Sequence, residues 1–378
     1  MEKTAITWRN GSDSQGRMPY SGAGRPGDLL RQGDVLGQEE QEEGKTTIRV
    51  RVEGNGIKLA MGEKGSELEI NGVAPFSLYH TVECGQAFRW RREGNWYEGV
   101  VRGTTLRLRQ IGEDAVSVWI PEHASDDEVH DILSLMRDYF CLDSDHAGIE
   151  LSLRERDPLL GPAIDYASGL RLVRQDPWEC LISFIISARN RIPLIVAALE
   201  RLSRRFGRPI DGPEGRAFWA FPEPDELSRA SEADIHDCGV GFRSGYVLGA
   251  ARAVASGEFD LGRLRQLPLE EARRSLMQLR GVGRKVADCV LLFAFQRYEA
   301  FPIDIWMERV MRYLYFQNEP ATLEGIQTFA RGRFGDLAGF AQEYLYHYAR
   351  NCLAEELRAW ASQAAGPAYH EARGDRIK

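Results

Sequence analysis

The stretch LRGVGRK, residues 279–285, decides the fold of this chain. Two glycines that flank a single valine cannot continue a helix at low cost, so Gly281 and Gly283 predict a tight hairpin after a helix over 269–279. Apolar residues recur at one-face spacing over 286–293 and predict a second, buried helix. Its start would present unpaired backbone N–H groups and the positive end of the helix dipole, which both favour a phosphate. The sequence therefore predicts a helix-hairpin-helix that can bind an anion.

Two ionisable residues mark the starts of successive helices. Lys285 lies in the first turn of the helix after the hairpin, and Asp304 precedes an apolar helix pattern at 305–310. Taken alone, the lysine indicates only a phosphate-binding corner and the aspartate only an N-cap. Because one buried helix joins the two starts, the amine and the carboxylate could also face the same cleft.

The run GVGRKVADC at 281–289, followed by PIDIW at 302–306, resembles the helix-hairpin-helix, Gly/Pro-Asp class of base-excision DNA glycosylases. Within that class it looks like the 8-oxoguanine DNA glycosylase/lyase, and the likeness extends over about 68–353. The resemblance implies that Lys285 is the catalytic nucleophile and Asp304 its essential partner. Cys289 follows the lysine by one helical turn. Its simpler interpretation is a small core residue, and the alternative is a dipolar partner of the lysine beside the bound base.

Upstream of the hairpin, alternating patterns give way to helical ones. Alternation of Ile48, Val50 and Val52 with charged residues predicts a strand, and a helix is expected over 128–140. We therefore expect an α+β fold, in which an N-terminal antiparallel β-sheet domain, TBP-like, precedes a mostly α-helical domain with the helix-hairpin-helix. Further strands are expected at 68–70, 87–90, 96–101, 106–110 and 116–119. The expected domains are a disordered leader at 1–45, the sheet domain and base-recognition half at 46–150, the helical glycosylase domain at 151–365 and a flexible tail at 366–378.

Three residues from two distant segments of the sequence are candidates for recognising a base. Gly85 opens the run GQAFRW and by itself predicts a turn or bulge. In the family that the chain resembles, the matching glycine offers its C=O to the N7–H of 8-oxoguanine, a hydrogen that guanine lacks. Gln342 and Tyr346 are spaced i and i+4 and share one helix face, which would ordinarily indicate packing. An extruded purine, however, needs an amide for its pairing edge and a ring to stack on.

The loop SARNR at 187–191 departs from the family pattern. The family has three asparagines, the first of which fills the gap left by the extruded base, and then an arginine that recognises the opposite cytosine. Those positions hold Arg189, Asn190, Arg191 and Leu194 here. Arg189 can still fill a gap, because its guanidinium is long and multidentate, but Leu194 cannot hydrogen-bond cytosine. The preferred opposite base is therefore left open.

Other DNA contacts are expected at loops and helix starts. Through the resemblance, GVGFR at 239–243 implies that Phe242 pushes at the extruded site and that Arg243 contacts the opposite base; otherwise it is a glycine loop with a surface arginine. Trp306 replaces the family's phosphate-binding histidine and could donate its indole N–H. No cofactor is expected to be required. The wider class suggests a cation at the hairpin, held by the backbone carbonyls of Met277, Leu279 and Val282.

Composition narrows the class of protein further. The net charge of −8 argues against a generic nucleic-acid coat, yet 171–207 holds seven arginines against three acidic residues, and 279–312 six basic against four acidic. Such stripes are usually solvated, but here they suit a DNA-facing surface. The six cysteines form no C-x-x-C pair, so neither a zinc or iron–sulfur site nor a disulfide framework is expected. Because the sequence shows no signal or membrane segment, we expect a cytoplasmic protein, close to the nucleoid if the source is bacterial. We also expect it to act as a monomer.

These patterns lead to one function and two rivals. We expect a bifunctional DNA glycosylase and AP lyase that excises 8-oxoguanine from duplex DNA. It would extrude the base, attack C1′ with Lys285 and eliminate the 3′ phosphate from a Schiff base. A monofunctional glycosylase for alkylated bases would share the hairpin and the aspartate but would lack the lysine nucleophile. A non-enzymatic DNA-binding module would use the hairpin only as a clamp.

Overall fold

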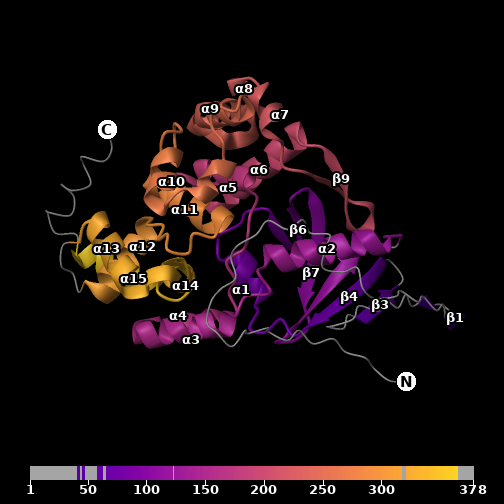
Figure 1. Ribbon diagram of the computed structural model, residues 1–378, viewed down its shortest axis with the longest axis horizontal. Coiled ribbons are helices and arrows are strands. Elements are labelled where there is room, and N and C mark those ends of the chain that lie inside the picture. The colour runs from indigo at the N-terminus through magenta and orange to yellow at the C-terminus, as the bar shows by residue number, and fades with distance from the viewer. Residues whose placement is uncertain are drawn as a thin grey trace.

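The computed structural model describes residues 41–42, 45–46, 58–62, 65–121, 123–316 and 321–364. An antiparallel sheet with strand order β3-β4-β8-β7-β6-β5 is followed by helices, so the predicted α+β architecture is confirmed (Figure 1). The strands of this sheet are β3 (Lys58–Gly62), β4 (Gly65–Asn71), β5 (Trp90–Glu93), β6 (Trp96–Val101), β7 (Thr104–Gln110) and β8 (Ala115–Ile120). Two separate ribbons pair β1 (Gln41–Glu42) with β2 (Lys45–Thr46) and β9 (Pro209–Asp211) with β10 (Ala217–Trp219).

The loop before β5 differs from the prediction. A strand is expected over 87–90, but the chain enters the sheet only at Trp90. The Gln86 side chain provides the reason, because its amide donates to the carbonyls of Thr81 at 2.9 Å and Arg171 at 2.7 Å, while its oxygen accepts from the Val173 N–H at 2.9 Å. These long-range bonds hold 84–89 as a loop. The strand predicted over 48–52, most of the leader and the tail lie outside the described residues.

The helix on the sheet begins two residues before its predicted start. In α2 (Asp126–Tyr139), the Ser125 hydroxyl accepts from the Glu128 N–H at 3.3 Å, and the Glu128 carboxylate accepts from the Ser125 N–H at 2.8 Å. This reciprocal capping fixes the first turn. The other helix of this half is the short α1 (Leu78–Glu83).

The remaining described chain is mainly helical, and in Figure 1 its helices extend away from the sheet, with α13 and α15 farthest from it. No helix in the described part of the chain is long and apolar enough to cross a membrane. The helices are α3 (His146–Arg156), α4 (Gly161–Ala167), α5 (Pro177–Ser187), α6 (Ile192–Phe206), α7 (Pro224–Ser228), α8 (Glu232–Ile235), α9 (Ser244–Ala255), α10 (Leu269–Leu276), α11 (Arg284–Phe295), α12 (Ile305–Tyr315), α13 (Leu323–Phe334), α14 (Ala338–Asn351) and α15 (Ala354–Ala364).

Two hydrophobic cores underlie these halves. The first joins the inner face of the sheet to α2, and the second joins the helices from α3 onward. Cys84 and Phe88 belong to the helical core although they precede β5 in the sequence. The loop at 84–89 is therefore built into the junction between the halves. The expected domain boundary at 150 falls within α3, whose Leu153 packs in the helical core.

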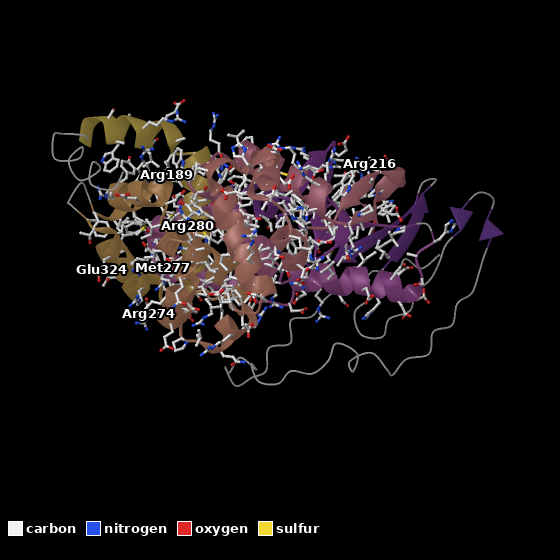
Figure 2. All side chains as sticks on the ribbon, turned by 90° about the horizontal axis from the view of Figure 1, so that it is seen from above. Arg189, Arg216, Arg274, Met277, Arg280 and Glu324 are labelled. Carbon is white, nitrogen blue, oxygen red and sulfur yellow. The ribbon has the colours of Figure 1, made fainter. Side chains whose placement is uncertain are left out.

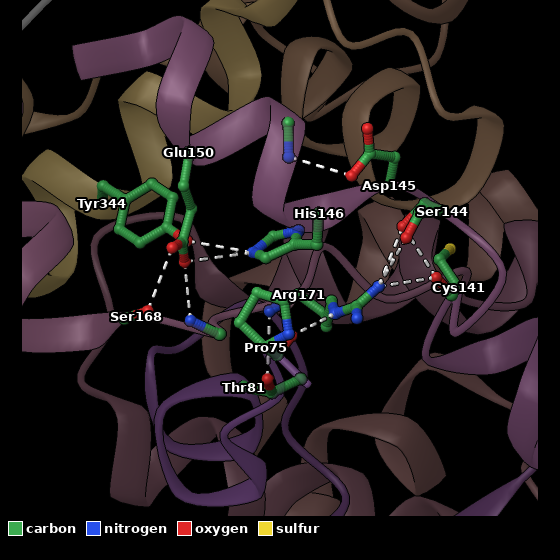
Figure 3. A network of polar contacts seen from close by, with 12 residues as sticks. Pro75, Thr81, Cys141, Ser144, Asp145, His146, Glu150, Ser168, Arg171 and Tyr344 are labelled. Carbon is green, nitrogen blue, oxygen red and sulfur yellow. Dashed lines mark hydrogen bonds and ion pairs between the residues drawn. The ribbon is translucent and has the colours of Figure 1, made fainter. Parts of the chain in front are cut away.

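A buried polar network ties α3 to α14 (Figure 3). The Tyr344 hydroxyl donates to Glu150 Oε1 at 2.7 Å and lies 3.0 Å from His146 Nε2. The Ser168 hydroxyl and the Gly169 N–H donate to the same carboxylate at 3.0 and 2.7 Å. Removing any one donor would leave a buried charge less well compensated. The network thus fixes the position of α14, which carries residues of the site described next.

Candidate active site

The glycine hairpin connects α10 to α11 as predicted, and its two glycines have different roles. Gly281 has φ +87°, and a Cβ there would meet the Tyr246 side chain at 2.5 Å, so only glycine fits without rearrangement. Gly283 is the N-cap of α11, and a Cβ there would meet nothing within 4 Å. The Val282 N–H closes the turn on the Leu279 carbonyl at 3.0 Å. The start of α11 is therefore open for a ligand to approach the backbone.

Lys285 projects from the first turn of α11 toward α5. Its Nζ lies 3.4 Å from the Ser187 hydroxyl and 4.9 Å from the centre of the Phe184 ring. The chain has 48 lysines and arginines, yet Lys285 is the only lysine between residues 65 and 377. Arginine cannot lose its proton at physiological pH, whereas lysine can act as a nucleophile. The sequence thus retains the deprotonatable cation at this position while using arginine throughout the rest of that range.

Asp304 caps α12, as its sequence context predicts. One carboxylate oxygen, Oδ1, accepts from the N–H groups of Trp306 and Met307, both at 2.9 Å. These bonds fix the carboxylate at the helix start, so its direction is set by backbone atoms.

Lys285 and Asp304 line one pocket of about 570 Å³, including its open mouth. Gly85, Gln342 and Tyr346 line the same pocket, so five of the candidate residues that come from distant segments meet there. The other lining residues are Phe88, Phe184, Ser187, Asn190, Ile192, Ile195, Cys289, Phe293, Pro302 and Glu343.

The loop at Gly85 and helix α14 form the wall opposite the lysine. Gly85 has φ +103°, and a Cβ there would lie 3.1 Å from Arg350 Nη1 and 3.3 Å from Ile192. Arg350 also donates to the Cys84 carbonyl at 3.3 Å and stacks over Tyr346. The Gln342 side chain is buried, and its Oε1 has no hydrogen-bond partner among the described residues.

Glu343, which lines the pocket, and Arg350, which packs behind Gly85 and Tyr346, are residues that the sequence did not single out. Burial raises the pKa of the Glu343 carboxyl to about 7, although contact with the Cys84 thiol and the charge of Arg350 act in the opposite direction. Burial likewise raises the pKa of the Cys289 thiol to about 12. The helical spacing of Glu343, Tyr346 and Arg350, at i, i+3 and i+7, is a signal that could have been used. It becomes meaningful only once Tyr346 is known to face the pocket.

The loop after α5 is supported from beneath by Arg243. This guanidinium is buried and donates to the carbonyls of Ala188, Arg189 and Val240, with the Arg189 contact at 3.1 Å. Its observed contacts hold the loop in place, and a contact with the opposite base stays a prediction. Phe242 is 64% exposed beside it. Arg189 has φ +52° and is exposed, and Figure 2 labels it on the helical half together with Arg280 and Met277.

Asn190 faces the pocket rather than open solvent. It is a lining residue, and its side-chain amide donates to the Ile186 carbonyl at 3.2 Å. Trp306 is half-buried at the start of α12, with the Arg309 guanidinium 5.9 Å from its ring. A donated hydrogen bond from its indole to phosphate stays a prediction.

The first basic stripe, over 171–207, does not form one DNA-facing surface. Arg171 is buried and donates to backbone carbonyls, including those of Pro75 and Cys141. Arg174, Arg204 and Arg205 form ion pairs with acidic side chains. The exposed Arg189 and Arg191 lie in the loop next to the pocket. Much of the positive charge counted in the sequence therefore stabilises the fold.

The fold and this pocket define the class of helix-hairpin-helix base-excision DNA glycosylases. Residues 182–332 match the model of the HhH-GPD superfamily base excision DNA repair protein, and residues 70–181 match that of the 8-oxoguanine DNA glycosylase N-terminal domain. The N-glycosylase/DNA lyase of Arabidopsis thaliana is 33% identical over 293 residues, which cover 72% of this chain and 79% of the relative. The chain belongs to the 8-oxoguanine DNA glycosylase/lyase family.

Other relatives agree with this membership. The probable N-glycosylase/DNA lyase of Methanothermobacter thermautotrophicus is 34% identical over 226 residues, covering 53% of this chain and 70% of the relative. A solved structure of the Clostridium acetobutylicum 8-oxoguanine glycosylase/lyase, in complex with double-stranded DNA containing cytosine opposite 8-oxoguanine, is 36% identical. Its TM-score is 0.70, and the match covers 77% of this chain and 97% of that one.

Proposed function

We propose that this chain excises 8-oxoguanine from duplex DNA and then cleaves the DNA strand, with Lys285 and Asp304 carrying both steps. The observation that carries the proposal is the convergence of these two residues with Gly85 and Gln342 in one pocket. A base stacked in a duplex cannot reach a pocket inside the protein, so the lesion must be extruded first.

In the first step, the uncharged Lys285 amine attacks C1′ of the deoxyribose. The bond from C1′ to the base breaks, and the base leaves with the electron pair and takes up a proton. The Asp304 carboxylate stabilises the positive charge that develops on the sugar and helps to remove the lysine's proton. Its fixed position at the start of α12 supports this role, because no reorganisation is needed during the reaction.

In the second step, the nitrogen of the adduct forms a double bond to C1′ while the C1′–O4′ bond of the sugar ring breaks and O4′ takes up a proton. This gives a protonated imine between Lys285 and the opened sugar. Removal of a proton from C2′ then expels the 3′ phosphate by β-elimination. Only an amine nucleophile gives this intermediate, so the presence of lysine at this position supports lyase activity.

The opposite wall would identify the base. The Gly85 carbonyl accepts the N7–H that distinguishes 8-oxoguanine from guanine, Gln342 bonds the pairing edge, and the Tyr346 ring stacks on the purine. The crowding around Gly85 supports its role, since a side chain there would press on Arg350, Ile192 and Tyr346 and displace the backbone from this position in the pocket wall. Cys289 lines the pocket beneath the lysine and would contact the base or sugar.

DNA outside the pocket would be held by the hairpin and by the loop after α5. The backbone at Gly281 and Gly283 would bind a phosphate, and the Trp306 indole N–H would donate a hydrogen bond to another. Arg189 would fill the gap left by the base, Phe242 would push at the extruded site, and Asn190 would contact the DNA. We expect the chain to act on duplex DNA as a monomer. Leu194 is 48% exposed and apolar, so we expect weak discrimination among opposite bases.

The hairpin carbonyls of Met277, Leu279 and Val282 would hold a cation if one is needed. The Val282 N–H donates to the Leu279 carbonyl, so these residues belong to one tight turn. A cation there would supply positive charge toward the DNA phosphate.

A nicking assay tests the proposal directly. Four duplexes are prepared, in which a single 8-oxoguanine lies opposite each of the four bases in turn. Strand cleavage is followed for the wild type, Lys285→Gln and Asp304→Asn. We expect cleavage by the wild type and none by the variants, with binding to damaged DNA largely retained. Base release without strand cleavage, and preference for alkylated bases, would favour the monofunctional rival. Absence of cleavage by every form would favour the DNA-binding module.

A further inference from the structure

Glu343 is a pocket residue that the proposed mechanism does not use, and the inference here rests on that proposed function. It follows Gln342 on α14, lines the same pocket and is only 2% exposed. A carboxyl group in such a place costs free energy unless it is compensated. Its retention at this position calls for a partner.

The protein leaves one oxygen of the Glu343 carboxyl without a hydrogen-bond partner among the described residues. That oxygen is Oε1, and the carboxyl contacts the Cys84 thiol. The neighbouring Gln342 Oε1 is also buried and without a partner there. Two acceptors on consecutive residues of α14 are therefore unsatisfied among the described residues that line this pocket. A ligand that completes both must present two hydrogen-bond donors.

Purines differ in this respect along their pairing edge. A guanine-derived base presents two neighbouring donors, N1–H and the N2 amino group. An adenine-derived base presents one amino group beside a bare N1 acceptor, which a carboxylate would repel. The edge of a guanine-derived lesion therefore complements the two free acceptors, and the edge of an adenine-derived lesion does not.

We propose that Glu343 is a specificity-determining residue that shares the pairing edge of the extruded base with Gln342, so that the two side-chain oxygens accept hydrogen bonds from N1–H and the N2 amino group. Together with Gln342 it selects guanine-derived lesions over adenine-derived ones. Gly85 would separately distinguish the oxidised base from guanine, because both of those share the same pairing edge. Gly85 would thus recognise the N7 edge of the purine, and Glu343 with Gln342 would recognise its pairing edge.

The charges around Glu343 are compatible with an ionised carboxylate once the base is bound. Lys285 and Arg350 favour the charged form, whereas burial and Asp304 oppose it. A hydrogen bond donated by the bound base to the Glu343 carboxylate further favours its charged form. The ionisable groups that interact with this carboxyl are Cys84, Lys285, Cys289, Asp304, Tyr346 and Arg350.

The test compares Glu343→Gln with the wild type on two lesions. Single-turnover excision is measured on duplexes that carry 8-oxoguanine or 8-oxoadenine opposite the same base, and nicking of a preformed abasic site is measured in parallel. An amide both accepts and donates, so it tolerates the adenine edge but loses the charge-assisted bonds. We expect excision of 8-oxoguanine to fall about 10- to 100-fold, the preference over 8-oxoadenine to fall at least about tenfold, and abasic-site nicking to change far less.

Other outcomes separate this inference from the proposed function. An equal loss on both lesions, or an equal loss of abasic-site nicking, would show that Glu343 acts on Lys285 and would overturn the inference. Failure of the wild type to nick an abasic site would instead contradict the proposed function. Glu324→Gln, at an exposed glutamate in the first turn of α13, is the matched control and should leave the preference unchanged. Thermal unfolding of each variant verifies that it is folded.

Discussion

The two walls of the pocket are built in different ways. The wall of Lys285 and Asp304 consists of side chains at the first turn or cap of consecutive helices, positioned by local backbone geometry. The wall of Gly85, Gln342, Glu343 and Tyr346 joins a loop from the sheet half to the middle of α14, and it holds buried acceptors without partners. The comparison suggests that the chemistry is fixed by local structure, whereas base recognition depends on long-range packing.

Replacing Lys285, in the wall that it forms with Asp304, should have the largest effect on activity. Lys285→Gln removes the nucleophile but keeps a polar side chain of similar reach. We expect the rate of 8-oxoguanine excision to fall by roughly 10⁴-fold or more in single-turnover assays, because no other lysine is among the described residues that line the pocket. Affinity for lesion-containing duplex, measured by fluorescence anisotropy at fixed salt, should change little. A loss of binding that matched the loss of rate would indicate a structural role for this residue.

Breaking the second wall should affect recognition more than chemistry. Gly85→Ala strains a residue at φ +103° and places a Cβ 3.1 Å from Arg350, which would shift the loop that presents the Gly85 carbonyl. We expect 8-oxoguanine excision to fall about 10- to 100-fold, with nicking of a preformed abasic site much less affected. Gly94→Ala is the matched control. Gly94 also has a positive φ, +61°, but a Cβ there would meet nothing within 4 Å, so only the strain should appear.

The buried carboxyl of the second wall should make stability depend on pH. The pKa of Glu343 is raised from its ordinary 4.5 to about 7, so the folded state binds this proton more tightly than the unfolded state. Its contribution is fully present below the unfolded pKa and is lost as the pH rises through 7. Between about pH 5 and pH 8 the stability of Glu343→Gln relative to the wild type should rise by about 2 to 3 kcal/mol. Urea unfolding at both pH values measures this change, and an unchanged difference would show that Glu343 titrates normally.

Weakening the support of α14 should have the smallest effect. Tyr344→Phe removes the hydroxyl that donates to Glu150 at 2.7 Å and leaves that buried carboxylate with one donor fewer. We expect a loss of about 1 to 2 kcal/mol in urea unfolding. Tyr348→Phe on the same helix, whose ring packs on Tyr166, is the control and should cost less. Equal losses in both variants would mean that the network does not anchor the recognition wall.

The sequence predicted the wall of Lys285 and Asp304 better than the wall of Gly85, Gln342, Glu343 and Tyr346. The glycine hairpin, the N-cap at Asp304 and the strand at 96–101 all follow from patterns within a few residues, and each is found in the structure. Gly85, Gln342 and Tyr346 could be named only through a family resemblance, since no local pattern shows that they meet. Glu343 was missed because a glutamate on a helix is usually exposed, and its burial arises from packing against the loop at Cys84.

Long-range contacts, which no local sequence pattern shows, also explain the two sequence predictions that were wrong. The strand expected at 87–90 is replaced by a loop because Gln86 bonds to segments 5 to 87 residues away along the chain. The arginines at 171–207 were counted as one DNA-facing surface, but Arg171 is buried on backbone carbonyls, and Arg174 and Arg205 form ion pairs with partly exposed carboxylates. Charge counts do not show which cations are already paired.

Borohydride trapping tests the central claim most directly. The wild type is incubated with a duplex containing one 8-oxoguanine, the imine is reduced, and the DNA-linked peptide is identified by mass spectrometry. Because Lys285 is the only lysine between residues 65 and 377, an adduct within that range identifies the nucleophile without ambiguity. We predict an adduct on Lys285 that is absent from Lys285→Gln. Release of 8-oxoguanine without any adduct, or an adduct at another lysine, would contradict the account.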